Sequence, residues 1–364
     1  MTSSDKRKRW IPCVLMIALA LTSCSSERIV DHINIVTILG LDKNDAGFKE
    51  TGLYSDFNHA GRTALLQGNA KKPSLLLDEM NNQSSQPVAI SKLKLLIINK
   101  QLAEEGITLF IESICKDPLI SHYMIVAISD GAASSMLESL VDLKSENLPN
   151  YTIEHNIRSG AIPESNLHTL LFDYYGEGRD PSVPYLKLNQ KGKIVITGQA
   201  IFKDDRLKLI INQEEVAMYK MLQGHLLRGN VPFTIMLGQN EGTAVFNSLG
   251  GKKSQALSKS ARAPKVIYNI TMNGMIKDYP KWANLRKTGN DRLLIMQLEK
   301  QVRNKLLALL NKFVKNNVDP LGVGDLVRAH SKVWNEKEFY EVEYPNIKFE
   351  VHVNVNLMKS GIVE

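Results

Sequence analysis

The chain has 364 residues, which exceeds one typical domain, so two or three domains are expected. Its hydrophobic content of 43% is ordinary for a globular protein that builds buried cores. The net charge is +7, and the N-terminal segment supplies about +3 of it, because four basic residues there oppose one aspartate. The remaining charge is mild and dispersed, which argues against a nucleic-acid-binding protein.

The N-terminus has the features of a secretory signal with a lipid-attachment site. A basic head at residues 6–9 precedes an apolar run that starts at Trp10, and the run ends in Leu21-Thr22-Ser23-Cys24. This ending resembles a bacterial lipobox, in which the Cys thiol is acylated and becomes the mature N-terminus. An uncleaved anchor is one alternative, but about 12 apolar residues span only about 18 Å of a ~30 Å membrane core. The other alternative is an ordinary secretory signal with a coincidental cysteine.

We therefore predict a signal peptide at residues 1–23, lipidation at Cys24, and a chain held by lipid on the extracytoplasmic face of the cell membrane. Two other cysteines exist, and Cys13 leaves with the signal. Because Cys115 then stands alone, no intramolecular disulfide is expected, and stability must come from core burial. After Leu21 no long apolar segment follows, so the sequence predicts an anchored protein that does not span the membrane.

Residues 24–145 are predicted to form an N-terminal α/β domain, because strand and helix patterns alternate there. The expected strands are residues 35–41, 93–98 and 123–128, and the expected helices are residues 74–83, 101–115 and 133–143. Gly106 weakens the second helix. Asp42 and Asn44 superficially suggest a calcium loop, but Ala46 and Leu53 occupy ligand positions. A turn between two strands fits residues 42–47 better.

Residues 146–192 are predicted to form a small middle domain or a linker. The stretch 147–158 is polar, a short helix is expected from Ile162 to about Phe172, and a strand is expected near residues 185–188.

Residues 193–364 are predicted to form a C-terminal α+β domain. A hairpin is expected from strands at residues 194–202 and 207–211, and Asn212 with Glu215 has the spacing of a capping box for the next helix. Periodicity is weak between residues 230 and 264. Further strands are expected at residues 266–272 and 347–357, and the longest helix at residues 291–317. The apolar stripe of this helix, from Ile295 to Phe313, is expected to pack on its own sheet, with a partner-binding helix as the alternative.

The search for chemistry finds no enzyme motif. The eight histidines are scattered, and no metal-ligand pair, Cys pair or nucleophile elbow occurs. The stretch 250–254 resembles a phosphate loop only superficially, because Phe246 stands where the first glycine belongs, and a solvated loop is expected there instead. The adjacent carboxylates at 204–205 and 214–215 are expected to mark a turn and a helix start, and His352 a solvated strand position.

Several stretches together resemble the Ger(x)C family. They are residues 35–43, 162–164, 198–207, 214–215 and 318–325, then Trp334 and a terminal strand ending near Gly361. Their order, with the lipobox first, matches the family over essentially the whole mature chain. One departure is the stretch after Cys24, where family members often carry Trp and then Asp-Arg-Arg-Glu, but this chain has Ser25-Ser26-Glu27-Arg28.

The resemblance implies a C subunit of a spore germinant receptor, lipid-anchored on the outer face of the inner spore membrane beside integral A and B subunits. It implies a fold of three domains built on sheets with packed helices, which agrees with the mixed α/β (α+β) class and the mostly antiparallel C-terminal sheet expected above. No catalytic residue, metal or cofactor is implied, and Gly198 and the 319–324 turn are interpreted as structural. A solute-binding lipoprotein of a transporter is the alternative function. Whether this subunit binds a small molecule is left open.

Overall fold

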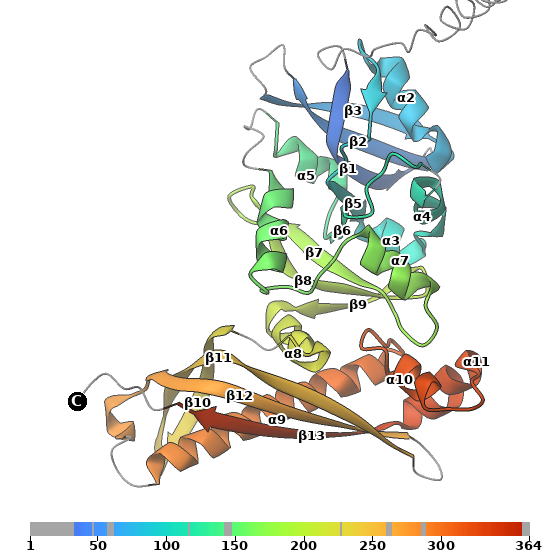
Figure 1. Ribbon diagram of the computed structural model, residues 1–364. Coiled ribbons are helices and arrows are strands. Elements are labelled where there is room, and N and C mark those ends of the chain that lie inside the picture. The colour runs from blue at the N-terminus through green and yellow to red at the C-terminus, as the bar shows by residue number, and fades with distance from the viewer. Residues whose placement is uncertain are drawn as a thin grey trace, which may run out of the picture.

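The chain folds into two β-sheets with helix α8 (Gln213–Gln223) between them, as the computed structural model in Figure 1 shows. The structure describes residues 33–45, 47–56, 62–115, 117–141, 148–225, 228–259, 264–284 and 289–358. This confirms the mixed α/β class that the sequence predicts.

The first sheet has the strand order β3-β2-β1-β5-β6-β7-β8-β9, with β4 beside β1. The pairs that join β1, β5, β6 and β7 are parallel, and the remaining pairs along this order are antiparallel. Its strands are β1 (Asn34–Asn44), β2 (Gly47–Asp56), β3 (Arg62–Ala70), β4 (Val88–Ala89), β5 (Leu95–Asn99), β6 (Ile125–Ser129), β7 (Ser182–Leu188), β8 (Ile194–Lys203) and β9 (Arg206–Asn212).

Helices cover both faces of this sheet, which explains why its central strands are continuous apolar runs. On β5, Leu95 and Ile97 face one buried cluster, whereas Leu96 and Ile98 face the other. One face packs against α2 (Leu76–Gln83), α3 (Lys100–Glu105), α4 (Thr108–Cys115) and α7 (Leu167–Tyr175). The other packs against α5 (Ala133–Glu138), α6 (Pro149–Arg158) and α8.

Three helix predictions in this part need correction. The helix expected at residues 101–115 is two helices, because Gly106 has φ +131° and the Asp205 carboxylate occupies the space that a Cβ would need. The helix expected at 133–143 ends at Glu138. The polar stretch before residue 158 is helix α6, which starts at Pro149, and the helix expected from Ile162 starts only at Leu167, after the capping residue Asn166.

The second sheet has the order β10-β11-β12-β13 and curls around the long helix α9 (Asn290–Lys315). Its strands are β10 (Arg228–Leu237), β11 (Asn240–Lys259), β12 (Pro264–Asp278) and β13 (Lys348–Leu357), and only the β12–β13 pair is parallel. The strands β10 and β11 lie where the sequence showed weak periodicity and were not predicted. The apolar stripe of α9 packs on this sheet, as expected, with Leu298, Val302 and Leu306 buried.

Side chains of α9 form hydrogen bonds with the backbone of both outer strands of this sheet. The amide of Gln297 accepts from the Met236 backbone N–H and donates to its carbonyl, and Gln301 makes the same pair of bonds with Thr234 on β10. On the other edge, the carboxylate of Glu299 accepts a hydrogen bond from the Val355 backbone N–H of β13 at 2.8 Å. The helix thus provides the hydrogen bonds that a neighbouring strand would otherwise make.

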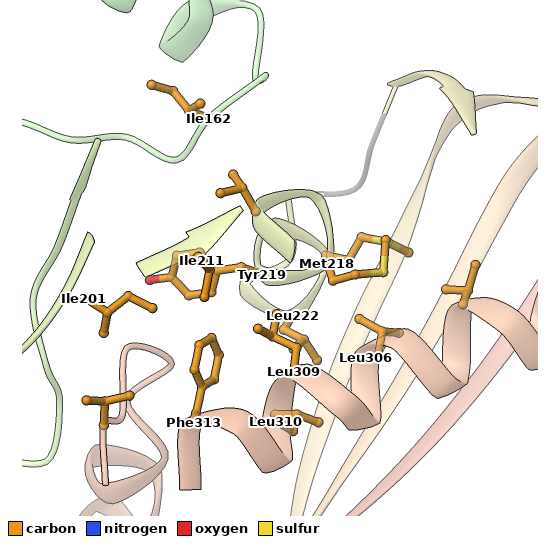
Figure 2. Packing of buried hydrophobic residues seen from close by; sticks show 14 of the residues in the cluster. Ile162, Ile201, Ile211, Met218, Tyr219, Leu222, Leu306, Leu309, Leu310 and Phe313 are labelled. Atoms are coloured by element: carbon orange, nitrogen blue, oxygen red, sulfur yellow. The ribbon is translucent and has the colours of Figure 1, made fainter. Parts of the chain in front are cut away.

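One hydrophobic cluster runs from the first sheet into the second through α8 (Figure 2). Tyr219 of α8 packs edge-on against Phe313 of α9, with ring centroids 6.0 Å apart. The capping box of Asn212 and Glu215 starts α8 as predicted. Glu215 also pairs with Lys312 of α9 at 2.7 Å. The two sheets therefore share a buried core.

The expected boundary at residue 193 falls between β7 and β8, which are neighbours in the first sheet. Strands β6 and β7 are joined by only two residue pairs, Ile128 with Tyr185 and Ser129 with Leu186. The division of the chain into three domains stays a prediction.

Candidate functional site

The predicted lipid site Cys24 and the whole signal peptide lie outside the described residues. The first described strand, β1, begins at Asn34, ten residues after Cys24 in the sequence. Within the part of the chain that is described, no helix combines the length and apolarity needed to cross a membrane. Lipid attachment therefore stays a prediction from the sequence.

The most concentrated chemistry in the described chain is a buried polar cluster where the two sheets meet. Asp180 lies just before β7, and Asp319 lies in the loop after α9, 139 residues later. The Asp180 backbone N–H donates to the Asp319 carbonyl at 3.0 Å, and the Asp319 N–H donates to the Asp180 carboxylate at 2.5 Å. Both residues are buried, with 3% and 0% of their surface exposed. We call Asp180, Lys203, Asp319 and Tyr340 the joint.

Asp319 organises the C-terminal side of the joint. Its two carboxylate oxygens accept from the backbone N–H groups of Val323 at 2.9 Å and Gly324 at 2.7 Å, and Tyr340 donates its hydroxyl at 3.2 Å. Val323 and Gly324 are the first two residues of helix α10 (Val323–Ala329), so Asp319 satisfies N–H groups that have no partner inside the helix. This accounts for the Asp-Pro-Leu-Gly-Val-Gly stretch as a turn that closes one helix and opens the next.

Lys203, at the end of β8, supplies the cation of the joint. Its Nζ lies 3.2 and 3.4 Å from the two Asp180 carboxylate oxygens and 3.5 Å from the centroid of the Tyr340 ring. Burial raises the pKa of Asp180 to about 7, although Lys203 opposes the rise. Burial likewise raises the pKa of Asp319 to about 6, although the hydrogen bonds from two backbone N–H groups of α10 act to lower it. One lysine thus faces two buried carboxyl groups.

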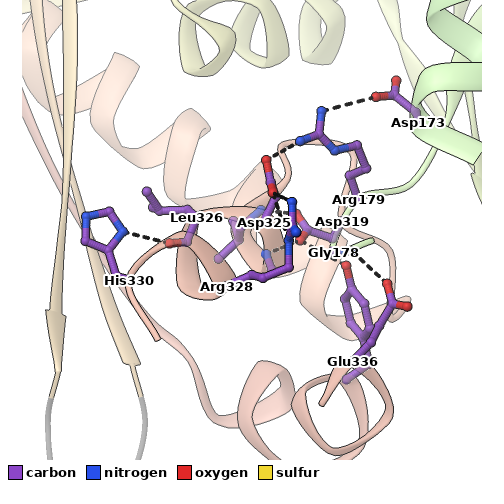
Figure 3. A network of polar contacts seen from close by, with 12 residues as sticks. Asp173, Gly178, Arg179, Asp319, Asp325, Leu326, Arg328, His330 and Glu336 are labelled. Carbon is purple, nitrogen blue, oxygen red and sulfur yellow. Dashed lines mark hydrogen bonds and ion pairs between the residues drawn. The ribbon is translucent and has the colours of Figure 1, made fainter. Parts of the chain in front are cut away.

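A second layer of polar contacts surrounds the joint (Figure 3). Arg179 pairs with Asp325 of α10 and lies 3.8 Å from Asp173 of α7. The backbone N–H of Gly178 donates to Glu336 of α11 (Glu336–Glu338) at 2.7 Å, and its carbonyl accepts from the Asp325 N–H at 2.9 Å. The segment before β7 is therefore bonded to both short helices of the C-terminal part.

Gly178 shows how closely these segments approach. Its φ is +77°, and a Cβ at this position would overlap the Asp325 backbone nitrogen. Across the contact, Gly324 presents its backbone to Gly178, and a Cβ on Gly324 would meet the Gly178 Cα at 2.8 Å. Larger side chains on either glycine would push the two parts of the protein apart.

The chemistry of the joint is structural. Both carboxylate oxygens of Asp319 accept backbone or hydroxyl hydrogen bonds, and both oxygens of Asp180 are engaged by Lys203, so the groups hold chain segments together. No cluster of three or more histidine, cysteine or carboxylate side chains suited to a metal ion occurs among the described residues. Sequence reasoning did not single out Asp180, Lys203 or Tyr340. Their partners lie too far along the chain for any local spacing to reveal them.

Other residues that the sequence analysis weighed have definite places. Asp204 and Asp205 form the β8–β9 turn, and Glu214 and Glu215 lie in the first turn of α8, as expected. The expected loop at residues 250–254 is instead the interior of β11. At Gly198 of β8, a Cβ would overlap the backbone carbonyl oxygen of Ile211 on β9.

The turn expected at residues 42–47 is tighter than predicted, because residues 42–44 continue β1. Asp42 is buried, and its two carboxylate oxygens accept from the backbone N–H groups of Ala133 and Ser134 at 2.7 and 2.8 Å. His352 is exposed and lies 2.7 Å from Glu350 on the same strand.

Comparisons with known proteins find matches along nearly the whole chain. Residues 26–188 match the family described as "Spore germination protein N-terminal domain", and residues 197–361 match "Spore germination B3/ GerAC like, C-terminal". The spore germination protein GerQC of Bacillus cereus is 24% identical over 364 residues, covering 98% of this chain and all of that protein. A relative named YfkR from Bacillus subtilis (strain 168) is 23% identical, and the alignment covers 98% of this chain and 98% of that protein.

A crystal structure of the GerBC protein has the same overall fold. It superposes with a TM-score of 0.57 at 14% identity and covers 88% of this chain and 97% of that one. At this identity the likeness shows the fold alone. Because the two family domains together match most of the chain, and in the expected order, this protein belongs to the Ger(x)C family of spore germination proteins.

Proposed function

We propose that this protein is the lipid-anchored C subunit of a nutrient germinant receptor, a non-catalytic subunit that works beside integral membrane A and B subunits in spore germination. The observation that carries the proposal is the match to both spore germination domains, over residues 26–188 and 197–361, directly after the lipobox-like Leu-Thr-Ser-Cys24. Lipid attachment would hold the folded part at the extracytoplasmic face of the inner spore membrane. Tethering raises the effective concentration of the protein for docking onto membrane partners.

The fold supports this function over a solute-binding lipoprotein of a transporter. A solute-binding protein that closes around its ligand needs two similar lobes with a cleft between them. Here the two sheets differ in strand number and order. The polar groups at their contact are engaged with one another in the joint.

Replacing Cys24 with Ala tests the anchor. We expect the C24A protein to leave the membrane fraction for the soluble fraction, and we expect the matched variant C115A, which also loses a cysteine, to remain with membranes. Retention of C24A in the membrane fraction would contradict lipid attachment at this residue.

Purification from detergent-solubilised membranes tests the partners. We expect tagged wild-type protein to co-purify with multi-span A and B subunits. Calorimetry of the purified protein with amino acids and sugars separates the two functions. Micromolar binding by this protein alone, without co-purifying membrane subunits, would favour the solute-binding alternative.

A further inference from the structure

One strand of the second sheet has a long edge with which no described segment of the chain pairs. Strand β11 has 20 residues, but β10 pairs with it only as far as Arg228 opposite Leu249. On its other side β12 pairs with β11 all the way to Lys259. At about 3.3 Å per residue, residues 251–259 therefore present an edge of roughly 30 Å that is unpaired within the described chain.

This edge differs from the other two edges of the same sheet. Gln297 and Gln301 of α9 bond the edge of β10, and Glu299 bonds the edge of β13. Among the hydrogen bonds of the described residues, none joins the outer backbone of residues 251–259 to another segment. An open edge of this length is a template for another strand, and proteins usually close or blunt it.

The space beside the start of this edge is a cleft of about 480 Å³. It separates β11 from helices α8 and α10, and its walls include Leu222, Gln223, Lys253, Gln255, Leu326 and Ala329. The side-chain oxygen of Gln223 is buried there without a hydrogen-bond partner. Two residues of the edge, Lys253 and Gln255, thus line a cleft that contains an unsatisfied hydrogen-bond acceptor.

The charges along this edge select the chemistry of its occupant. Lys252 is exposed and Lys253 is half-buried, and successive residues of a strand point to opposite faces of the sheet. Neither lysine has a carboxylate partner among the described side chains, and the Lys253 Nζ lies 5.7 Å from the centroid of the Tyr268 ring. The acidic groups of the cleft wall, Asp173 and Asp325, are paired with Arg179. Unneutralised positive charge therefore lies on both faces of the strand.

We propose that residues 251–259 bind an extended, acidic segment of a partner protein, which adds to β11 as a further strand. Main-chain hydrogen bonds would provide the pairing, and Lys252 and Lys253 would select carboxylates at neighbouring positions of the incoming strand. A second copy of this chain would bring two more lysines to the same edge.

The test uses the full-length protein in detergent and a fluorescent seven-residue valine peptide with blocked ends, in which two neighbouring central positions are Glu so that one carboxylate lies on each face of the strand. We expect binding that slows amide hydrogen exchange of residues 251–259 at least tenfold. The same peptide with Lys in place of Glu should bind at least tenfold more weakly, and a backbone N-methylated Glu peptide should not bind, because it cannot donate to a strand.

The double variant K252E/K253E should reverse this preference, losing the Glu peptide and gaining the Lys peptide. A gain of binding can come only from a folded protein, so it also controls for misfolding. K300E, at an exposed position of α9 away from the edge, makes one Lys-to-Glu change of the same kind and should leave binding unchanged. Equal affinity for the two peptides, or unchanged exchange at residues 251–259, would overturn the proposal. So would concentration-dependent dimerisation that protects this edge, which would assign it to a second copy.

The unpaired edge belongs to β11 of the second sheet, far along the chain from Cys24, so this result does not depend on lipid attachment or on the receptor proposal. A failed peptide test with an intact C24A result would leave the anchor in place and remove only this docking surface.

Discussion

Replacing Lys203 with Met probes the electrostatics of the joint. The Lys203 side chain is 18% exposed and that of Asp180 is 3% exposed, so the substitution leaves a buried carboxylate without its cation. Breaking a buried pair in this way costs about 3–5 kcal/mol. We expect K203M to lower the free energy of unfolding by about 3 kcal/mol at pH 8. This is the low end of that range, because the Asp180 carboxylate still accepts a hydrogen bond from the Asp319 N–H.

The loss of stability caused by K203M should be smaller at acidic pH. Because the folded-state pKa of Asp180 is about 7, its carboxyl group is largely protonated at pH 5 and gains little from a neighbouring cation. At pH 5 the remaining cost should be about 1 kcal/mol, from the lost contact of Lys203 with the Tyr340 ring. Lys203 is thus expected to matter more as the pH rises from 5 to 8.

Urea unfolding followed by tryptophan fluorescence measures this difference. Trp334 packs against Phe339 with centroids 5.3 Å apart, close to the joint, and reports its opening. In a D180N background the K203M substitution should cost clearly less at pH 8 than it does in the wild type, because the Asp180 carboxylate is then absent and only the interactions of Lys203 with Asp319 and with the Tyr340 ring are lost. Equal costs at pH 5 and 8, or additive costs of the two substitutions, would refute the reasoning.

Three further predictions follow from buried or closely approached residues. Glu50 is 7% exposed, and burial raises its pKa to about 8, so the folded state keeps a proton that the unfolded chain releases near pH 4.5. The free energy of unfolding of the wild type therefore falls as the pH rises from 4.5 to 8. In urea titrations, the free energy of unfolding of E50Q relative to the wild type should be on the order of 3 kcal/mol higher at pH 8 than at pH 4. G178A should lower the midpoint of thermal unfolding far more than G192A, because both have φ above +65° but only Gly178 contacts backbone. Q297A/Q301A should expose the edge of β10 and increase light scattering at high protein concentration.

Each of these has a clear contrary result. A stability of E50Q that parallels the wild type across this pH range would mean that the carboxyl group is ionised in the folded protein. Equal midpoints for the two glycine variants would mean that the close contact is not needed. Unchanged scattering of the glutamine double variant, with K300A as the matched control on α9, would mean that the helix amides do not protect β10.

Features whose signals are local could be predicted from the amino-acid sequence. The alternation of residues 347–357 predicted β13, the three-and-four spacing of apolar residues predicted α9, and Asn212 with Glu215 predicted the start of α8. Each pattern reflects contacts or faces within a few residues, so it can be read without knowing what packs against it. The ordered family motifs were similarly readable and predicted the family that the comparisons confirm.

Features whose partners are distant in the sequence became visible in the folded protein. The joint brings Asp180 to Asp319, and the helix expected at residues 101–115 is divided where Asp205 approaches Gly106. β11 carries little apolar alternation over residues 250–259, since most of that stretch is exposed, and it is a strand because β12 pairs with it. In each case the stabilising group is supplied by another segment of the chain, so no local spacing could have specified it.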